Sequence, residues 1–272
     1  MASLTALREL LEPTSLPAEL VDEVLSDTNT LWLLGAADEL VASELVLCHP
    51  PLGPGEVRAV VNQTEHPRLW RVTVVTRDRP GLLAGTSATL SGAGLSIADA
   101  AVTVLPRSRL AMQRLTVSTA RGEMPDLEWN RLGRDLRDNL ADGKLPPTPF
   151  TPRGPVVVEA QPQELGRTVV TVEAPDGVGL LHASSAWFEA NGCNVEACRA
   201  GTEGDRARSV FIVVGAVDTA ALAAALGGPG AGSIVTRVAT TPLHVAVGLA
   251  KIPCRLLGDA VGVVGRILQK RK

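Results

Sequence analysis

The sequence predicts an α+β protein of two tandem βαββαβ domains, with a helical extension at each end. Two observations lead to this prediction. Residues 71–103 recur at 169–201 with a constant offset of 98 residues and without a gap. Within each copy, strand-like alternation and helix-like spacing of apolar residues follow one another in the same order. Two copies are too few for a solenoid, so we interpret them as tandem domains.

Before the repeat, residues 1–69 predict helices followed by a loop. Residues 4–11 form a short amphipathic stretch, and residues 18–25 and 30–47 carry helical spacing. The run HPPLGPG at 49–55 ends the last of these helices, because proline disfavours helical geometry in the residue before it.

Each copy of the repeat then contains the same six elements. In the first and then the second copy they are a strand (70–76; 168–174), a helix (81–92; 179–191), a strand (95–105; 193–201), a strand (110–119; 207–214), a helix (125–141; 218–226) and a closing strand (155–160; 233–240). This order predicts the ferredoxin-like arrangement, an antiparallel sheet with both helices on one face.

The predicted domains are therefore 70–160 and 161–241, preceded by the helical N-terminal region 1–69. A proline-rich loop at 144–155 is expected before the closing strand of the first domain. The tail, 242–272, ends in a stretch with one apolar helical stripe, so we expect an amphipathic C-terminal helix.

Composition excludes several functional classes. The net charge is −3 and tyrosine is absent, so we expect neither direct nucleic-acid binding nor attraction to an anionic bilayer. The sequence contains no run of about 18 apolar residues that would predict a membrane span, and no signal peptide is evident. We therefore expect a reduced, cytoplasmic protein. Cys193 and Cys198 fall on opposite faces of a predicted strand, which argues against a disulfide or a zinc pair.

The turn between the first strand and the first helix is the most informative part of the repeat. The turn has the same four residue types in both copies: Asp78, Gly81, Leu82 and Leu83 in copy 1 correspond to Asp176, Gly179, Leu180 and Leu181 in copy 2. The first N–H groups of a helix have no partner inside the helix and can bind an amino acid carboxylate. The aspartates can accept from a ligand ammonium, and glycine lets a ligand approach the backbone. The alternative is ordinary turn and capping chemistry.

These residues resemble a known family. The segment DRPGLLAGTSATLSGAGLSIADAAVT at 78–103 resembles the ACT domain signature, and PDGVGLLHASSAWFEANGCNVEACRA at 175–200 resembles a divergent ACT domain. ACT domains are small regulatory modules, so the resemblance implies amino acid binding where two of them meet. The tandem layout is most similar to the C-terminal ACT pair of the bacterial PII uridylyltransferase/uridylyl-removing enzymes, where such domains sense glutamine.

The resemblance also adds the start of the second strand to the ligand site. It implies Ser96 and Ile97 in copy 1, and Asn194 and Val195 in copy 2. Asn194 matches the usual asparagine of the family, whereas copy 1 has Ser96 there. Copy 2 lacks the Arg-Pro of the turn and has Gly177 and Val178. Since each copy departs from the pattern at a different place, we expect a single competent interface.

No catalytic motif accompanies the repeat. There is no His-Asp dipeptide, and the four histidines are scattered over different segments. The main hypothesis is therefore a non-enzymatic amino acid sensor of amino acid or nitrogen metabolism, without cofactor or metal, that acts on an unknown protein partner. The resemblance makes glutamine the first ligand to consider, and a homodimer stays open.

Two alternatives to the sensor also stay open. The first is an interaction module with structural ACT domains, in which the terminal helices, such as the amphipathic Leu256–Lys272, dock on a protein or a membrane surface. The second is a regulator of gene expression that works through a partner, because no helix-turn-helix or basic recognition helix is present.

Overall fold

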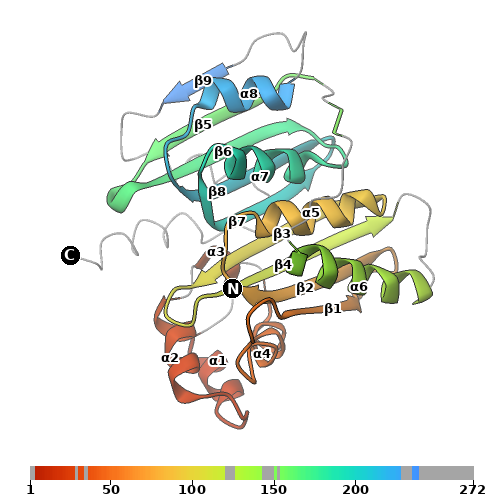
Figure 1. Ribbon diagram of the computed structural model, residues 1–272, viewed down its shortest axis with the longest axis vertical. Coiled ribbons are helices and arrows are strands. Elements are labelled where there is room, and N and C mark those ends of the chain that lie inside the picture. Colours follow the sequence, from red (N-terminus) through yellow and green to blue (C-terminus); the bar gives the residue numbers. More distant parts are fainter. Residues whose placement is uncertain are drawn as a thin grey trace.

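The computed structural model describes residues 4–27, 30–33, 36–119, 126–142, 150–151, 154–227 and 235–238 (Figure 1). In chain order the elements are α1 (Leu4–Leu11), α2 (Ala18–Asp27), α3 (Thr30–Leu33), α4 (Asp38–Val46), β1 (Val57–Gln63), β2 (Leu69–Arg77), α5 (Leu82–Gly92), β3 (Leu95–Leu105), β4 (Leu110–Thr119), α6 (Asp126–Asp142), β5 (Val157–Pro162), a 3-10 turn (Glu164–Gly166), β6 (Arg167–Pro175), α7 (Leu180–Ala190), β7 (Asn194–Glu203), β8 (Arg206–Val214), α8 (Thr219–Gly227) and β9 (Val235–Val238).

The strands of the described chain form one sheet in the order β1-β2-β4-β3-β7-β8-β6-β5-β9. Strands β1 to β4 form repeat 1 and strands β5 to β8 form repeat 2, and all neighbours within a repeat are antiparallel. Helices α5 to α8 lie together on one face of this sheet, where their apolar side chains and those of the strands form one core (Figure 1). The predicted α+β architecture of two ferredoxin-like units is confirmed.

The opposite face of repeat 1 is covered by α1 to α4. Alternate residues of a strand point to opposite faces, so Val74 of β2 joins the α5–α8 core while the next residue, Val75, packs with the N-terminal helices. This second core also contains Leu105 and Met112 of the sheet and Leu45 of α4. The N-terminal helices are therefore part of the folded body of repeat 1.

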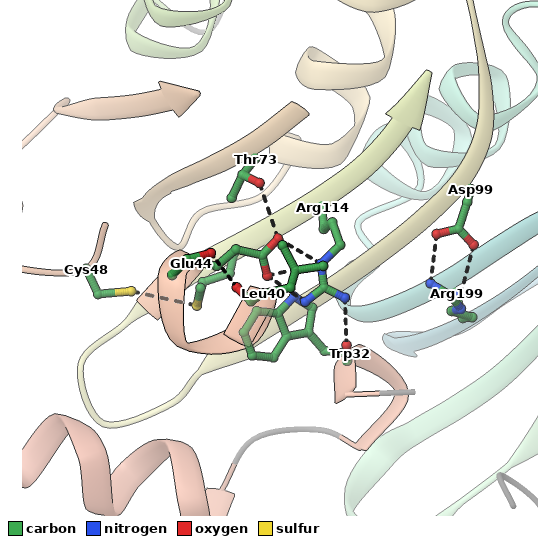
Figure 2. A network of polar contacts seen from close by, with 10 residues as sticks. Trp32, Leu40, Glu44, Cys48, Thr73, Asp99, Arg114 and Arg199 are labelled. Carbon is green, nitrogen blue, oxygen red and sulfur yellow. Dashed lines mark hydrogen bonds and ion pairs between the residues drawn. The ribbon is translucent and has the colours of Figure 1, made fainter. Parts of the chain in front are cut away.

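A buried ion pair ties α4 to the sheet (Figure 2). Arg114 Nε of β4 donates to both carboxylate oxygens of Glu44, at 2.7 and 3.0 Å, and Thr73 Oγ1 donates to the same carboxylate at 3.2 Å. Arg114 Nη1 donates to the carbonyl oxygen of Trp32 at 3.2 Å, and the guanidinium carbon lies 4.9 Å from the Trp32 ring centroid. Both charges are buried, so each depends on the other for its solvation.

The two repeats pair with each other inside this one chain. β3 and β7, the second strands of the two copies, are antiparallel neighbours, with Asp99 opposite Gly201 and Thr103 opposite Ala197. On the helical face, Ser87 Oγ of α5 lies 3.4 Å from Ser185 Oγ of α7. Since these serines are themselves repeat equivalents, the two units are related by an approximate two-fold axis.

The predicted closing strands were wrong in their partners. Residues 155–160 were expected to complete repeat 1, but β5 pairs with β6, with Val158 opposite Val172. The strand predicted at 233–240 appears as β9, which is parallel to β5 and lies outside it. A local pattern identifies a strand but does not identify its partner. The place beside β2 is taken by β1, and the place beside β6 is taken by β5.

That preceding strand was missed in the first repeat. Residues 57–63 were interpreted as loop, yet β1 pairs with β2 over its whole length, with Val60 opposite Thr73. The helix predicted over 30–47 is also interrupted, since α4 begins at Asp38 after Ala37 in an extended conformation. Acidic residues in the first turn of α4 favour a new helix start there. The predicted tail helix, and residues 144–149 and 152–153 of the predicted 144–155 loop, lie outside the described residues.

Candidate ligand sites between the two repeats

The two repeated turns have the same backbone geometry. Gly81 and Gly179 are the N-cap residues of α5 and α7, with φ values of 82° and 91°. Other residues are strained at such angles, so both turns require glycine. Neither N-cap provides a side-chain hydrogen bond, and the Asp78 carboxylate accepts instead from the backbone N–H of Arg79. Since glycine has no side chain, neither N-cap residue can itself cap the first-turn N–H groups of its helix.

Each turn opens onto a hollow that the other repeat completes. The first, site 1, has a volume of about 390 Å³ counted to its open mouth and combines the repeat 1 turn with α7 and the start of β7. The second, site 2, measures about 360 Å³ on the same basis and combines the repeat 2 turn with β3. The antiparallel pairing of β3 with β7 explains this exchange, because it sets the start of each strand beside the end of the other.

The structure redistributes the predicted ligand residues between the two hollows. Site 1 is lined by Asp78, Gly81, Leu82, Leu83, Asn194 and Val195. Site 2 is lined by Asp176, Gly179, Leu180, Leu181 and Ile97. Ser96 lines neither of these two hollows and lies in β3 opposite Ser118. The turn of each copy thus meets residues at the start of the second strand of the other copy, Asn194 and Val195 in site 1 and Ile97 in site 2.

Two polar side chains outside the predicted ligand set, Gln113 and Glu189, also line site 1. Gln113 reaches it from β4, and Glu189 reaches it from α7 of the other repeat. The Glu189 carboxylate lies against the turn, since a Cβ placed on Gly81 would be 2.6 Å from Glu189 Cδ. Gln113 was open to prediction as a polar residue inside the apolar strand LAMQRLTVST, while the approach of Glu189 depends on how the repeats pair.

Charged side chains of both signs line site 1: Asp78 and Glu189 are acidic and Arg79 is basic. Burial raises the pKa of Asp78 above its usual value, and the nearby Glu196 carboxylate adds to this effect. The backbone N–H of Arg79 and the charge of Arg109 act in the opposite direction but are weaker. A carboxylate in these surroundings gains from the approach of a cationic group such as a ligand ammonium.

Site 1 is also tied to the N-terminal helices. The backbone N–H of Asp78 donates to the carbonyl oxygen of Arg109 at 2.8 Å, in the hairpin turn between β3 and β4. The buried Glu23 of α2 accepts the backbone N–H groups of Arg107 and Ser108 in that same turn. In repeat 2 the corresponding bond runs from Asp176 to Asp205 at 2.7 Å. The ligand turn of repeat 1 therefore rests on a hairpin that α2 holds.

The described residues offer neither metal ligands nor a membrane-spanning helix. No group of three or more His, Cys, Asp and Glu side chains among them is placed to hold a metal ion. Cys48, Cys193 and Cys198 are buried free thiols, and burial raises the pKa of Cys48 to about 12. Within the same part of the chain, every helix is too short or too polar to cross a bilayer.

Comparison with known proteins gives one sequence relative. No protein-family model matches the chain. It is 31% identical over 173 residues to the bifunctional uridylyltransferase/uridylyl-removing enzyme of Bordetella avium (strain 197N), a match that covers 58% of this chain and 20% of that enzyme. The chain therefore spans about a fifth of the length of this relative.

Two solved structures show a distant likeness. Aspartate kinase from Synechocystis is 16% identical with a TM-score of 0.36, over 58% of this chain and 26% of the kinase. A putative glycine cleavage system transcriptional repressor is 15% identical with a TM-score of 0.22, over 57% of this chain and 86% of its own. Scores this low add no argument, so the fold rests on the strand pairing described above. That pairing shows two ferredoxin-like units, and the ACT family remains a resemblance of the repeated segments.

Proposed function

We propose that this protein is a non-enzymatic sensor of the ACT type that binds a free amino acid between its two repeats and passes the bound state to a protein partner. One observation carries the proposal: at site 1 a helix N-terminus without a side-chain cap opens onto a hollow that the other repeat completes. In this proposal the ligand carboxylate binds the first-turn N–H groups of α5, and Asp78 accepts from the ligand ammonium.

A ligand held in this way would act on the arrangement of the protein. Because it touches both repeats, it binds the paired arrangement best and shifts the population toward it. The hydrogen bond from Asp78 to Arg109, and the grip of Glu23 on that hairpin, support a route from site 1 to α2. We propose that the partner reads the position of the N-terminal helices.

The sequence relative supports a role in amino acid or nitrogen metabolism. Its uridylyltransferase and uridylyl-removing activities are not part of our proposal, because this chain corresponds to about a fifth of that enzyme. The family resemblance makes glutamine the first ligand to test. The packing of α1 to α4 against the sheet of repeat 1 weakens the alternative in which the N-terminal helices are free docking elements.

Thermal unfolding of the full chain in the presence of each of the twenty amino acids tests the proposal. A ligand at a hundred times its dissociation constant adds about 2.7 kcal/mol of stability, so one amino acid should raise the melting temperature clearly. Asp78→Asn should lower the affinity for that amino acid by about tenfold or more, because the ligand ammonium loses a charged acceptor.

Asp176→Asn is the matched control, since it makes the same change in the turn of site 2. It should have the smaller effect on affinity. No stabilisation by any amino acid at millimolar concentration would rule out the sensor, and an equal loss in both variants would rule out site 1 as the principal site.

A further inference from the structure

One buried position distinguishes the two hollows. In site 1 it is Gln113 of β4, which lies opposite Val74 of β2. In site 2 it is Ser209 of β8, which lies opposite Val172 of β6. Val74 and Val172 are repeat equivalents, so Gln113 and Ser209 occupy the same place in the two sheets. The same backbone position thus offers a long carboxamide in one site and a short hydroxyl in the other.

The Gln113 side chain is buried without hydrogen-bond partners. The residue is 1% exposed, and neither its Nε2 nor its Oε1 has a partner. Among the described residues it is the one side chain with two different buried polar atoms, Nε2 and Oε1, that lack a partner. Buried polar groups in native proteins are nearly always paired, because an unpaired amide loses its hydration without compensation. The position therefore calls for an occupant with matching groups.

The surroundings of Gln113 restrict that occupant. Val102, Val104 and Ala111 give site 1 apolar walls beside the carboxamide. The enclosed part of the hollow has room for little more than a water molecule, and most of its volume belongs to the open mouth. Only a short group reaching inward from the turn can meet Gln113, and it gains most if it both donates and accepts hydrogen bonds.

We infer that Gln113 reads the side chain of the bound amino acid, and that site 1 selects a short side chain ending in a hydroxyl or a carboxamide. This inference rests on the proposed function. The turn at Gly81 holds the zwitterionic end of the ligand, Gln113 Nε2 donates to the ligand side chain, and Gln113 Oε1 accepts from it. Ser209 has a single short hydroxyl at the equivalent place, so site 2 lacks this selection.

Calorimetric titration with near-isosteric ligands tests the inference on the full chain. Threonine against valine and asparagine against leucine differ in hydrogen-bonding groups but hardly in shape. The wild type should prefer the polar member of at least one pair by about tenfold or more, because an apolar analogue leaves Gln113 unpaired. Gln113→Leu should reduce that preference to about onefold, whereas the matched Ser209→Ala should leave it unchanged.

Gln113→Leu is a suitable variant because it keeps a similar volume and removes two unpaired polar atoms. Its melting temperature without ligand should therefore equal or exceed that of the wild type, which separates loss of selection from loss of fold.

The possible outcomes separate this inference from the proposed function. A polar preference that survives in Gln113→Leu overturns the inference and indicates that solvent satisfies Gln113. A preference lost in Ser209→Ala instead assigns selection to site 2, and tightest binding of an apolar amino acid to the wild type also overturns the inference. Each of these results leaves an amino acid sensor standing. Failure of the wild type to bind any amino acid overturns both.

Discussion

The two repeats have the same strand order but different cover. In repeat 1, β2 is buried at five consecutive positions, 72–76, whereas in repeat 2 the equivalent strand β6 alternates between buried and half-buried positions. The difference comes from α1 to α4, which cover the outer face of repeat 1. The backbone pairing is thus the same in both copies, but β2 is buried on both faces of the sheet and β6 on one face only.

The difference in cover goes with a difference in chemistry. Repeat 1 carries the buried Glu44–Arg114 pair and a hairpin held by Glu23, and its ligand turn faces Gln113 and Glu189. Site 2 has the apolar Ile97 and the small Ser209 among its lining residues. Different side chains at equivalent backbone positions explain why one fold offers two unequal hollows.

The largest effect should come from breaking the ion pair that holds the N-terminal cover. Arg114→Ala leaves the Glu44 carboxylate buried without its partner, which typically costs about 3–5 kcal/mol. Urea unfolding followed by tryptophan fluorescence measures the loss, because Trp32 lies in the affected core.

The control for this prediction lies in repeat 2. Arg208→Ala breaks a pair with Glu173 that is less buried than Glu44–Arg114, so the loss should be smaller, toward the roughly 0–1 kcal/mol of exposed pairs. If both variants lost the same free energy of unfolding, the N-terminal cover would not be what distinguishes the repeats.

A smaller effect is expected at the two turn glycines. Alanine at φ near +80° to +90° is strained by about 1–2 kcal/mol, so Gly179→Ala should lose roughly that much. Gly81→Ala should lose more, because its Cβ would meet the Glu189 carboxylate. Thermal denaturation of the two variants compares the turns directly.

Removing the Glu189 side chain tests the origin of that excess. The double variant Gly81→Ala/Glu189→Ala should return to the loss seen for Gly179→Ala, relative to Glu189→Ala alone. An excess that persists would place the strain in the backbone of the first turn.

The smallest effect concerns pH. Burial, together with the Glu196 carboxylate, raises the pKa of Asp78 in the folded protein. The folded state then holds the Asp78 proton more tightly than the unfolded chain does. Stability is therefore lost as the pH rises from the pKa of Asp78 in the unfolded chain through its higher pKa in the folded protein. Asp78→Asn should therefore gain stability over the wild type near pH 7, and the gain should vanish below about pH 4.

Urea midpoints of the wild type and Asp78→Asn across this pH range check the expectation, with Asp176→Asn as the control for the same substitution in the other turn. A gain for Asp78→Asn that grows toward acid would contradict the direction of the pKa shift.

Much of the fold was accessible from local patterns. The alternation in residues 71–76 and the Asp-x-x-Gly-Leu-Leu turn place β2 and α5 to within a few residues. The glycine geometry and the helix start of both turns were also accessible, since they are properties of a short segment. The edge strands were assigned wrongly, because the choice between β1 and β5 as neighbour of β2 depends on the rest of the sheet.

The sequence alone therefore established the repeat, its secondary structure and the turn that begins each central helix, all of which depend on contacts within some ten residues. The pairing of β3 with β7, the approach of Glu189 to Gly81 and the burial of Gln113 needed the folded chain. These features join residues that are far apart in sequence, and packing energy summed over the whole sheet selects them. The two candidate sites belong to this second group, because residues of both repeats line each of them.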